Sequence, residues 1–275
     1  MLMESRQWLE QELEQIHKWE RAQGKVRIWD RIGRIPFALL DKVTPDFIQD
    51  KLGKALDELG KFVQTGGGYL SSEKAVANYF NNKQVRTIAD AAMMPVSAMD
   101  EAADRVAGTR TNIATVQGAS TGFGGIFTLS LDIPVLLGLQ LKTLQDIAMC
   151  YGFNPADPKE RLFIVKVMQF VTSDNHGRDA ILKQMGSLDA GSEKARREMV
   201  SELKGWREVV MSFRDRWGMK KMFQLIPVAG LVFGAITNRS TVSELAETGA
   251  ILYRKRRIQE RLASLELQEE ASVNQ

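Results

Sequence analysis

One short motif, Gly118-Ala119-Ser120-Thr121-Gly122, has the G-x-S-x-G spacing of a nucleophile elbow. The elbow needs a strand that turns sharply into a helix, because this geometry exposes the serine oxygen beside an oxyanion hole. A serine nucleophile also needs a histidine base and an orienting carboxylate, for which His176 and Asp174 are the candidates. No convincing strand precedes the motif, so a serine hydrolase using Ser120 is an alternative hypothesis only.

Metal and redox chemistry finds few ligands in this chain. Its 275 residues include two histidines, His17 and His176, and one cysteine, Cys150. One cysteine forms no intrachain disulfide, and two distant histidines leave little for a metal cluster, so we expect no metal and no cofactor. The glycine-rich stretch 122–125 lacks the third glycine of a dinucleotide loop. Enzymatic activity is therefore uncertain, and the composition favours a non-enzyme.

Charge is almost balanced over the whole chain but unevenly distributed along it. Lysine and arginine total 37 against 34 acidic residues, a net charge of +3, which does not favour nucleic acid as a partner. The stretch from Ala114 to Leu141 carries one charge, Asp132, and the stretch from Met222 to Asn238 carries none. Prolines and glycines interrupt both stretches. We interpret them as buried core helices, with membrane-apposed hairpins as the alternative.

Glycines mark both charge-poor stretches. Gly118 and Gly122 in the first, and Gly230 and Gly234 in the second, form small-xxx-small patterns that let helix backbones approach closely. The two stretches are therefore expected to pack on each other. Whether they contact lipid or only each other is left open by the sequence.

Three charged features near these stretches each have two interpretations. Asp132 is predicted to cap a helix that starts at Pro134, with a buried functional carboxylate as the alternative. The basic run Arg254–Arg257 is predicted to be a solvated helix surface, helped by Glu260 four residues after Arg256, with contact to anionic lipid or nucleic acid as the alternative. Lys220 and Lys221 precede the second stretch and are membrane-facing candidates.

Helical periodicity and helix-terminal signals predict an all-α fold. Leu9, Leu13 and Ile16 form an apolar stripe on a first helix. Thr44-Pro45-Asp46 and Ser72 can each begin a helix, and Pro95 is expected to divide the segment 88–107 into two. A heptad-like seam between Met199 and Trp217 predicts another helix.

Further signals bracket the helices in the second half of the chain. Gly152 in Tyr151-Gly152-Phe153 is expected to take the left-handed conformation at a helix end. Asp157-Pro158-Lys159-Glu160 predicts a capping box that opens the next helix. Thr241 and Glu244 predict a capping box that opens the last helix, which runs toward Leu265.

Several of these segments resemble the EcsC family of bacterial proteins. The similar blocks are GASTGFGG, DIPVLLGLQLKTLQDIAMCYGF and DPKERLF between residues 118 and 163, and LIPVAGLVFGAITN at 225–238. The family's motifs fall on Asp132, Pro134, Tyr151, Gly152, Glu160, Arg161, Pro227, Gly230, Gly234 and Asn238. The resemblance covers roughly residues 70–257 and implies no established enzymatic activity. The family takes its name from a gene beside the Ecs ABC transporter, which suggests a membrane transporter component as partner.

Together these observations predict a helical extension at 1–69, an EcsC-like helical domain at 70–265 and a frayed tail at 266–275. We expect a non-enzymatic cytoplasmic protein that acts at or near the inner membrane face, as accessory to an ABC transporter or secretion system. An apolar-ligand or lipid carrier is a further alternative. The residues expected to shape an interface are Gly118, Gly122, Gly124, Gly125, Asp132, Pro134, Tyr151, Gly152, Glu160, Arg161, Pro227, Gly230, Gly234 and Asn238.

Overall fold

The computed structural model describes residues 4–23, 62, 71–122, 126–173, 175–189 and 227–273. Every regular element in these ranges is an α-helix, which confirms the all-α prediction. The helices are α1 (Arg6–Gln23), α4 (Glu73–Ala77), α5 (Ile88–Ala92), α6 (Val96–Gly122), α7 (Ile126–Cys150), α8 (Pro158–Thr172), α9 (Asn175–Asp189) and α12 (Pro227–Val273). The helix predicted to start at Thr44 and the seam at 199–217 lie outside the described residues.

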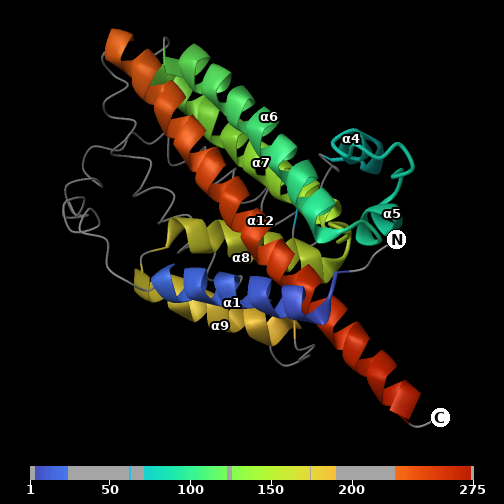
Figure 1. Cartoon of the computed structure of the whole chain (residues 1–275). Coiled ribbons are helices and arrows are strands. Elements are labelled where there is room, and N and C mark those ends of the chain that lie inside the picture. Colours follow the sequence, from blue (N-terminus) through green and yellow to red (C-terminus); the bar gives the residue numbers. More distant parts are fainter. Residues whose placement is uncertain are drawn as a thin grey trace.

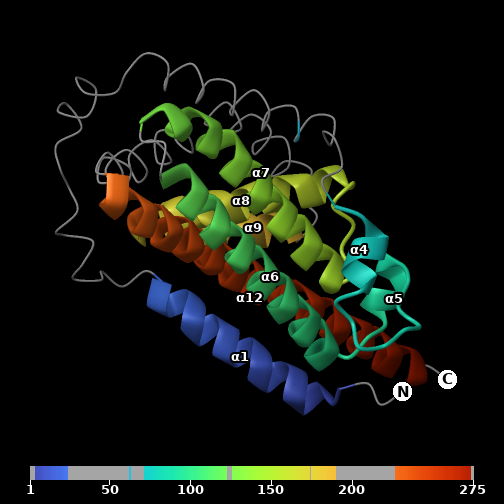
Figure 2. The same cartoon turned by 90° about the horizontal axis from the view of Figure 1, so that it is seen from above.

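Three long helices form the central layer. Helices α6, α7 and α12 run side by side, with α12 antiparallel to α6 (Figures 1 and 2). Helices α1, α8 and α9 form a second layer that crosses α12, and α4 and α5 lie against the end of α7 (Figure 1). The C-terminal part of α12 projects beyond this body. The tail predicted to fray is helical through Val273.

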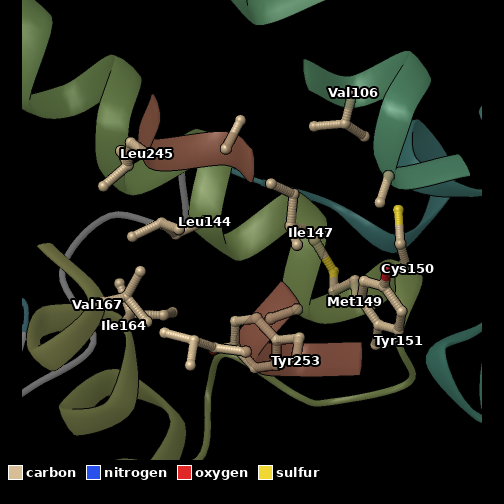
Figure 3. Packing of buried hydrophobic residues seen from close by; sticks show 14 of the residues in the cluster. Val106, Leu144, Ile147, Met149, Cys150, Tyr151, Ile164, Val167, Leu245 and Tyr253 are labelled. Atoms are coloured by element: carbon tan, nitrogen blue, oxygen red, sulfur yellow. The ribbon is translucent and has the colours of Figure 1, made fainter. Parts of the chain in front are cut away.

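The main core fills the space between the two layers. Leu144 and Ile147 of α7 meet Ile164 and Val167 of α8, with side chains of α12 beside them (Figure 3). Helix α12 approaches α7 closely at Gly249, where a Cβ atom would lie 2.5 Å from Leu144 Cδ2. Glycine at this position therefore sets how near the two helices can pack.

Helix α1 packs on a smaller apolar cluster, apart from the main core. Leu9 and Ile16 are buried against Val96 of α6 and Ile258 of α12, and Leu13 packs beside them. This confirms the stripe predicted for the first helix. Helix α1 is thus attached to the central layer through α6 and α12.

Several helix boundaries follow local signals in the sequence. The Ser72 hydroxyl accepts a hydrogen bond from the Ala75 N–H at 3.3 Å, and Pro95 lies between α5 and α6. Asp157 caps α8, with its carboxylate 2.8 Å from the Lys159 N–H. These three predictions are confirmed.

Two predicted caps are wrong because the helices begin earlier. Helix α7 begins at Ile126, so Asp132 does not cap it and Pro134 lies inside it. Helix α12 begins at Pro227, so Thr241 and Glu244 lie inside a continuous helix. The part of α7 after Pro134 is largely buried, and α12 buries Val242, Leu245 and Ala246 just after Thr241. This packing outweighs a local stop signal such as an interior proline, which costs about 3 kcal/mol.

Candidate functional site

The turn between α7 and α8 presses against α12. Gly152 has a φ of 78°, which L side chains rarely adopt, so the predicted left-handed position is confirmed. A Cβ atom at this position would lie 2.6 Å from the Ala92 Cα and 2.7 Å from Arg257 Nη2. Glycine is thus required twice, for the backbone conformation and for the close approach of α5 and α12.

Arg257 fastens this turn to α12. Its Nε and Nη2 atoms donate to the Tyr151 carbonyl oxygen at 2.8 and 2.6 Å. The Tyr151 hydroxyl in turn donates to Asp100 of α6 at 2.7 Å. The turn therefore joins three helices through polar contacts.

Arg256 lies among aromatic and acidic side chains next to Arg257, and both guanidiniums lie over the Phe153 ring. Its guanidinium donates to both carboxylate oxygens of Glu160 at 2.7 Å. The same group lies 4.3 Å from the ring centroid of Phe153 and 4.2 Å from that of Phe163, within cation–π range. Glu160 is thus engaged with α12, and the predicted capping box of α8 is wrong because the Asp157 N–H bonds to Asn154 instead.

The first two residues of the basic run face α1 and α6. Arg254 pairs with Glu12 at 2.8 Å and Asp100 at 3.0 Å, and Lys255 pairs with Glu20 at 2.7 Å. The solvated surface predicted for this run is wrong. Successive helical residues point all round the axis, and at this level other helices surround α12. We call Arg254–Arg257 with their partners Glu12, Glu20, Asp100, Tyr151 and Glu160 the ionic junction.

Burial sets the protonation of one part of the ionic junction. Burial raises the pKa of Asp100, against the hydrogen bond from Tyr151 and the charge of Arg254. Burial and the neighbouring Asp100 raise the pKa of Tyr151, so its hydroxyl keeps its proton and can donate. No group of histidine, cysteine and acidic side chains able to hold a metal ion occurs among the described residues. The contacts of this junction are those of a structural brace.

A second polar cluster joins α6 to α7. Arg110 Nε donates to Asp146 Oδ2 at 3.0 Å, and Lys142 Nζ lies 4.0 Å from the other carboxylate oxygen. Lys142 also donates to the Ser71 hydroxyl at 3.3 Å, and burial lowers its pKa. No sequence pattern had indicated that Arg110 and Asp146 would meet.

The charge-poor stretches form the ends of three helices, and these ends lie together. The end of α6 and the starts of α7 and α12 meet at one end of the central layer (Figures 1 and 2). We call residues 111–122, 126–141 and 227–238 the charge-poor end; Asp132 is its one charged residue. Large apolar side chains are exposed here, with Val116 at 70%, Val135 at 55% and Ile113 at 43%.

The residues predicted to shape an interface divide between these two places. Tyr151, Gly152 and Glu160 belong to the ionic junction, and Arg161 lies next to it with Nη1 donating to the Ala156 carbonyl at 2.6 Å. The charge-poor end contains Gly118, Gly122, Asp132, Pro134, Pro227, Gly230, Gly234 and Asn238. Asn238 is fully buried. Gly124, Gly125, Lys220 and Lys221 lie outside the described residues.

The nucleophile elbow does not have its required geometry. Residues 118–122 form the last turns of α6, which is helical from Val96 onward, so no strand leads into Ser120. His176 lies in the first turn of α9, and Asp174 is outside the described residues. The serine hydrolase hypothesis keeps no structural support from this motif.

The fold and its sites define an all-α protein with a braced centre and a charge-poor helix end. None of the helices, over the residues described, is long and apolar enough to cross a membrane. The EcsC protein family matches residues 10–258, and the chain belongs to this family.

Two relatives from Bacillus subtilis (strain 168) are similar along much of their length. "Uncharacterized protein YdbA" is 50% identical over 270 residues, 97% of this chain and 98% of the relative. "Protein EcsC" is 30% identical over 171 residues, 62% of this chain and 69% of the relative. No solved structure matches the chain.

Proposed function

We propose that this protein is a non-enzymatic helical protein that acts at the cytoplasmic face of the membrane through its charge-poor end. The carrying observation is that three helix ends with one charge among them gather at a single place, where Val116, Val135 and Ile113 are exposed. Exposed apolar side chains grouped in a charge-poor region are typical of a surface that meets lipid or a protein partner.

The dimensions of the charge-poor end suit insertion into one leaflet. At 1.5 Å per residue, its three segments rise about 18 to 24 Å along their helix axes. The hydrocarbon of one leaflet is about 15 Å thick, half of the bilayer's core. The end is therefore long enough to enter one leaflet. The helix bundle that carries it would remain at the membrane surface.

Charges flank this end on two of its helices. Along the chain, Arg110 directly precedes the charge-poor part of α6 and Lys142 directly follows that of α7. Both side chains lie beside the Asp146 carboxylate. Arg110 and Asp146 are both buried, so this cluster marks where the charged part of the bundle begins and supplies no contact to lipid headgroups.

The proposed protein partner rests on the family resemblance and not on the geometry of the charge-poor end. The resemblance to a family named after a gene beside an ABC transporter suggests an accessory or regulatory role with a transporter or secretion component. The lipid-carrier alternative has less support. The cavity between α4, α5 and α7, lined by Glu73, Phe80 and Met149, has a volume of about 10 Å³. That is room for about one water.

Vesicle flotation of the purified protein tests the proposal. Val116→Asp places a charge on the exposed face and is expected to lower the vesicle-bound fraction by about tenfold or more, because an inserted aspartate costs about 2.5–3.5 kcal/mol. Leu267→Asp is the matched control, since Leu267 is 67% exposed but lies on the projecting part of α12. Wild-type protein that stays in the unbound fraction, or equal loss in both variants, would refute the proposal.

A further inference from the structure

Two acidic residues of α1 and one just before it pair with cations of α12 between residues 254 and 261. Glu12 pairs with Arg254 at 2.8 Å, Glu20 pairs with Lys255 at 2.7 Å, and Glu4 pairs with Arg261. The carboxylates of these three acids are 13 to 17% exposed, so the pairs are largely shielded from water. The acids recur every eight residues, with Glu4 two positions before α1 and Glu12 and Glu20 within it.

Apolar side chains fill the space between these ion pairs. Leu9 and Ile16 of α1 are buried against Val96 and Ile258 in a cluster of their own. Trp19 is the exception, because it packs against Phe170 of the main core with ring centroids 5.9 Å apart. We call the face that α1 covers the α1 seat; it comprises Val96, Ile251, Arg254, Lys255, Ile258, Arg261, Leu262 and Leu265.

Val96, the α6 residue of the α1 seat, points away from Val116 of the charge-poor end. Val96 belongs to the seat, and Val116 lies twenty positions further along α6, a rotation of about 200° at 100° per residue. A membrane bound at the face of α6 that carries Val116 would therefore leave α1 on the opposite face, exposed to water. The seat is free of the proposed membrane contact.

We propose that the α1 seat is a groove for an acidic amphipathic helix of a partner protein, and that α1 is its occupant within the chain. A partner helix with acids and apolar residues at the spacings of α1 would reproduce each ion pair and each apolar contact. The contacts of α1 belong mainly to the smaller cluster, so its departure leaves the packing between α6, α7, α8 and α12 in place. This inference does not depend on the proposed membrane contact.

The pattern of cations favours a helix over a membrane or a nucleic acid. Arg254 and Lys255 are adjacent on α12, Ile258 lies between them and Arg261, and Leu262 follows. The neighbouring Arg256 and Arg257 are held by Glu160 and the Tyr151 carbonyl, so they add no charge to this face. Cations on either side of the buried Ile258 match the acidic and apolar positions of an amphipathic helix.

A peptide with the sequence of residues 4–23 serves as the probe for such a helix. The full-length variant Glu12→Gln/Glu20→Gln weakens the chain's own α1 and is expected to bind the labelled peptide about tenfold tighter than wild type, because less of its seat is occupied. Glu14→Gln is the matched control, since among the described residues Glu14 pairs with Lys18 of α1 at 2.9 Å, and the variant should leave peptide binding at the wild-type level. Fluorescence anisotropy measures both affinities.

Three results would overturn the assignment. They are the absence of peptide binding by the double variant, equal binding of a peptide with glutamine at positions 12 and 20, and peptide binding that survives Lys255→Gln. Two further results would assign the seat to another occupant. One is self-association of the double variant through α1, measured by light scattering. The other is that the double variant gains binding to phosphatidylglycerol vesicles or to an oligonucleotide and not to the peptide.

If the double variant does not fold, hydrogen exchange of the wild-type protein tests the proposal instead. Excess peptide should raise the exchange of the chain's own α1 amides between residues 8 and 19 and leave those of α7 unchanged, because only α1 is displaced. Unchanged α1 exchange at saturating peptide would overturn the proposal.

Discussion

The guanidinium of Arg256 donates to both carboxylate oxygens of Glu160, at 2.7 Å each, across 96 positions of the chain. Phe153 and Phe163 lie against the same guanidinium, so the pair is enclosed by rings as well as by helices. With Arg257 on the Tyr151 carbonyl, these contacts fix the α7–α8 turn to the middle of α12. The brace holds the layers together below the charge-poor end.

Loss of Arg256 should destabilise the fold strongly. Arg256→Gln leaves the Glu160 carboxylate buried without its partner, which costs about 3–5 kcal/mol of unfolding free energy. Urea denaturation checks the value, and the double variant Arg256→Gln/Glu160→Gln should lose less than the sum of its parts. Lys183→Gln breaks an exposed pair with Asp179 and should cost less than about 0.5 kcal/mol. Equal effects of the Arg256 and Lys183 substitutions would contradict the enclosed pair.

Two glycines of α7 and its terminal turn should respond oppositely to alanine. Gly152→Ala forces an L residue to a φ of 78° and places a Cβ 2.6 Å from Ala92, so we expect about 2–4 kcal/mol of destabilisation. Gly138→Ala is the control inside α7, where a Cβ would meet nothing within 4 Å and should stabilise by up to about 1 kcal/mol. Thermal and urea unfolding measure both, and a neutral Gly152→Ala would show that the turn can shift away from α5 and α12.

Acid should weaken the attachment of α1 through Glu4. Burial acts to raise the pKa of Glu4, but hydrogen bonds from the Val96 N–H at 2.5 Å and from Arg261 outweigh it and lower the pKa below 4.5. A lowered carboxyl pKa contributes stability that is fully present above 4.5 and is lost as the pH falls through the folded-state value.

Glu4→Gln isolates this contribution from other titrating groups. At pH 7 the variant should be about 2 kcal/mol less stable than wild type, since it loses hydrogen bonds to a charged group. The difference should shrink as the pH falls below 4.5, where wild-type Glu4 also becomes neutral. Urea unfolding across this range provides the measurement, and a difference that stays constant down to pH 3 would disprove the assigned role.

Local signals in the sequence located several helix ends correctly. Ser72, Pro95, Gly152 and Asp157 each act within a few residues of themselves, through a side-chain cap, a missing N–H or a left-handed φ. Such features are fixed by the chain nearby and need no knowledge of the fold. The family resemblance added the expectation that Tyr151, Gly152, Glu160 and Arg161 matter, and the structure brings them together.

The errors came from contacts between distant segments. The basic run Arg254–Arg257 has the composition of a surface, but α1, α6 and α8 surround it at that level of α12. Asp132 and Thr241 resemble caps, yet packing extends both helices through them. The Arg110–Asp146 pair depends on the register of α6 against α7, which no short-range pattern encodes.

Cys150 should be inert in the folded protein and reactive once it unfolds. Its side chain is fully buried at the end of α7, and burial, with Asp146 nearby, raises the pKa of the thiol, so little thiolate is present to react. Ellman's reagent should therefore label Cys150 at the rate of unfolding, which rises with added urea. Ser264→Cys in a Cys150→Ser background is the matched control, because position 264 is exposed on α12 and should label at once. Rapid labelling of wild-type protein without urea would show that the end of α7 opens far more readily than its packing indicates.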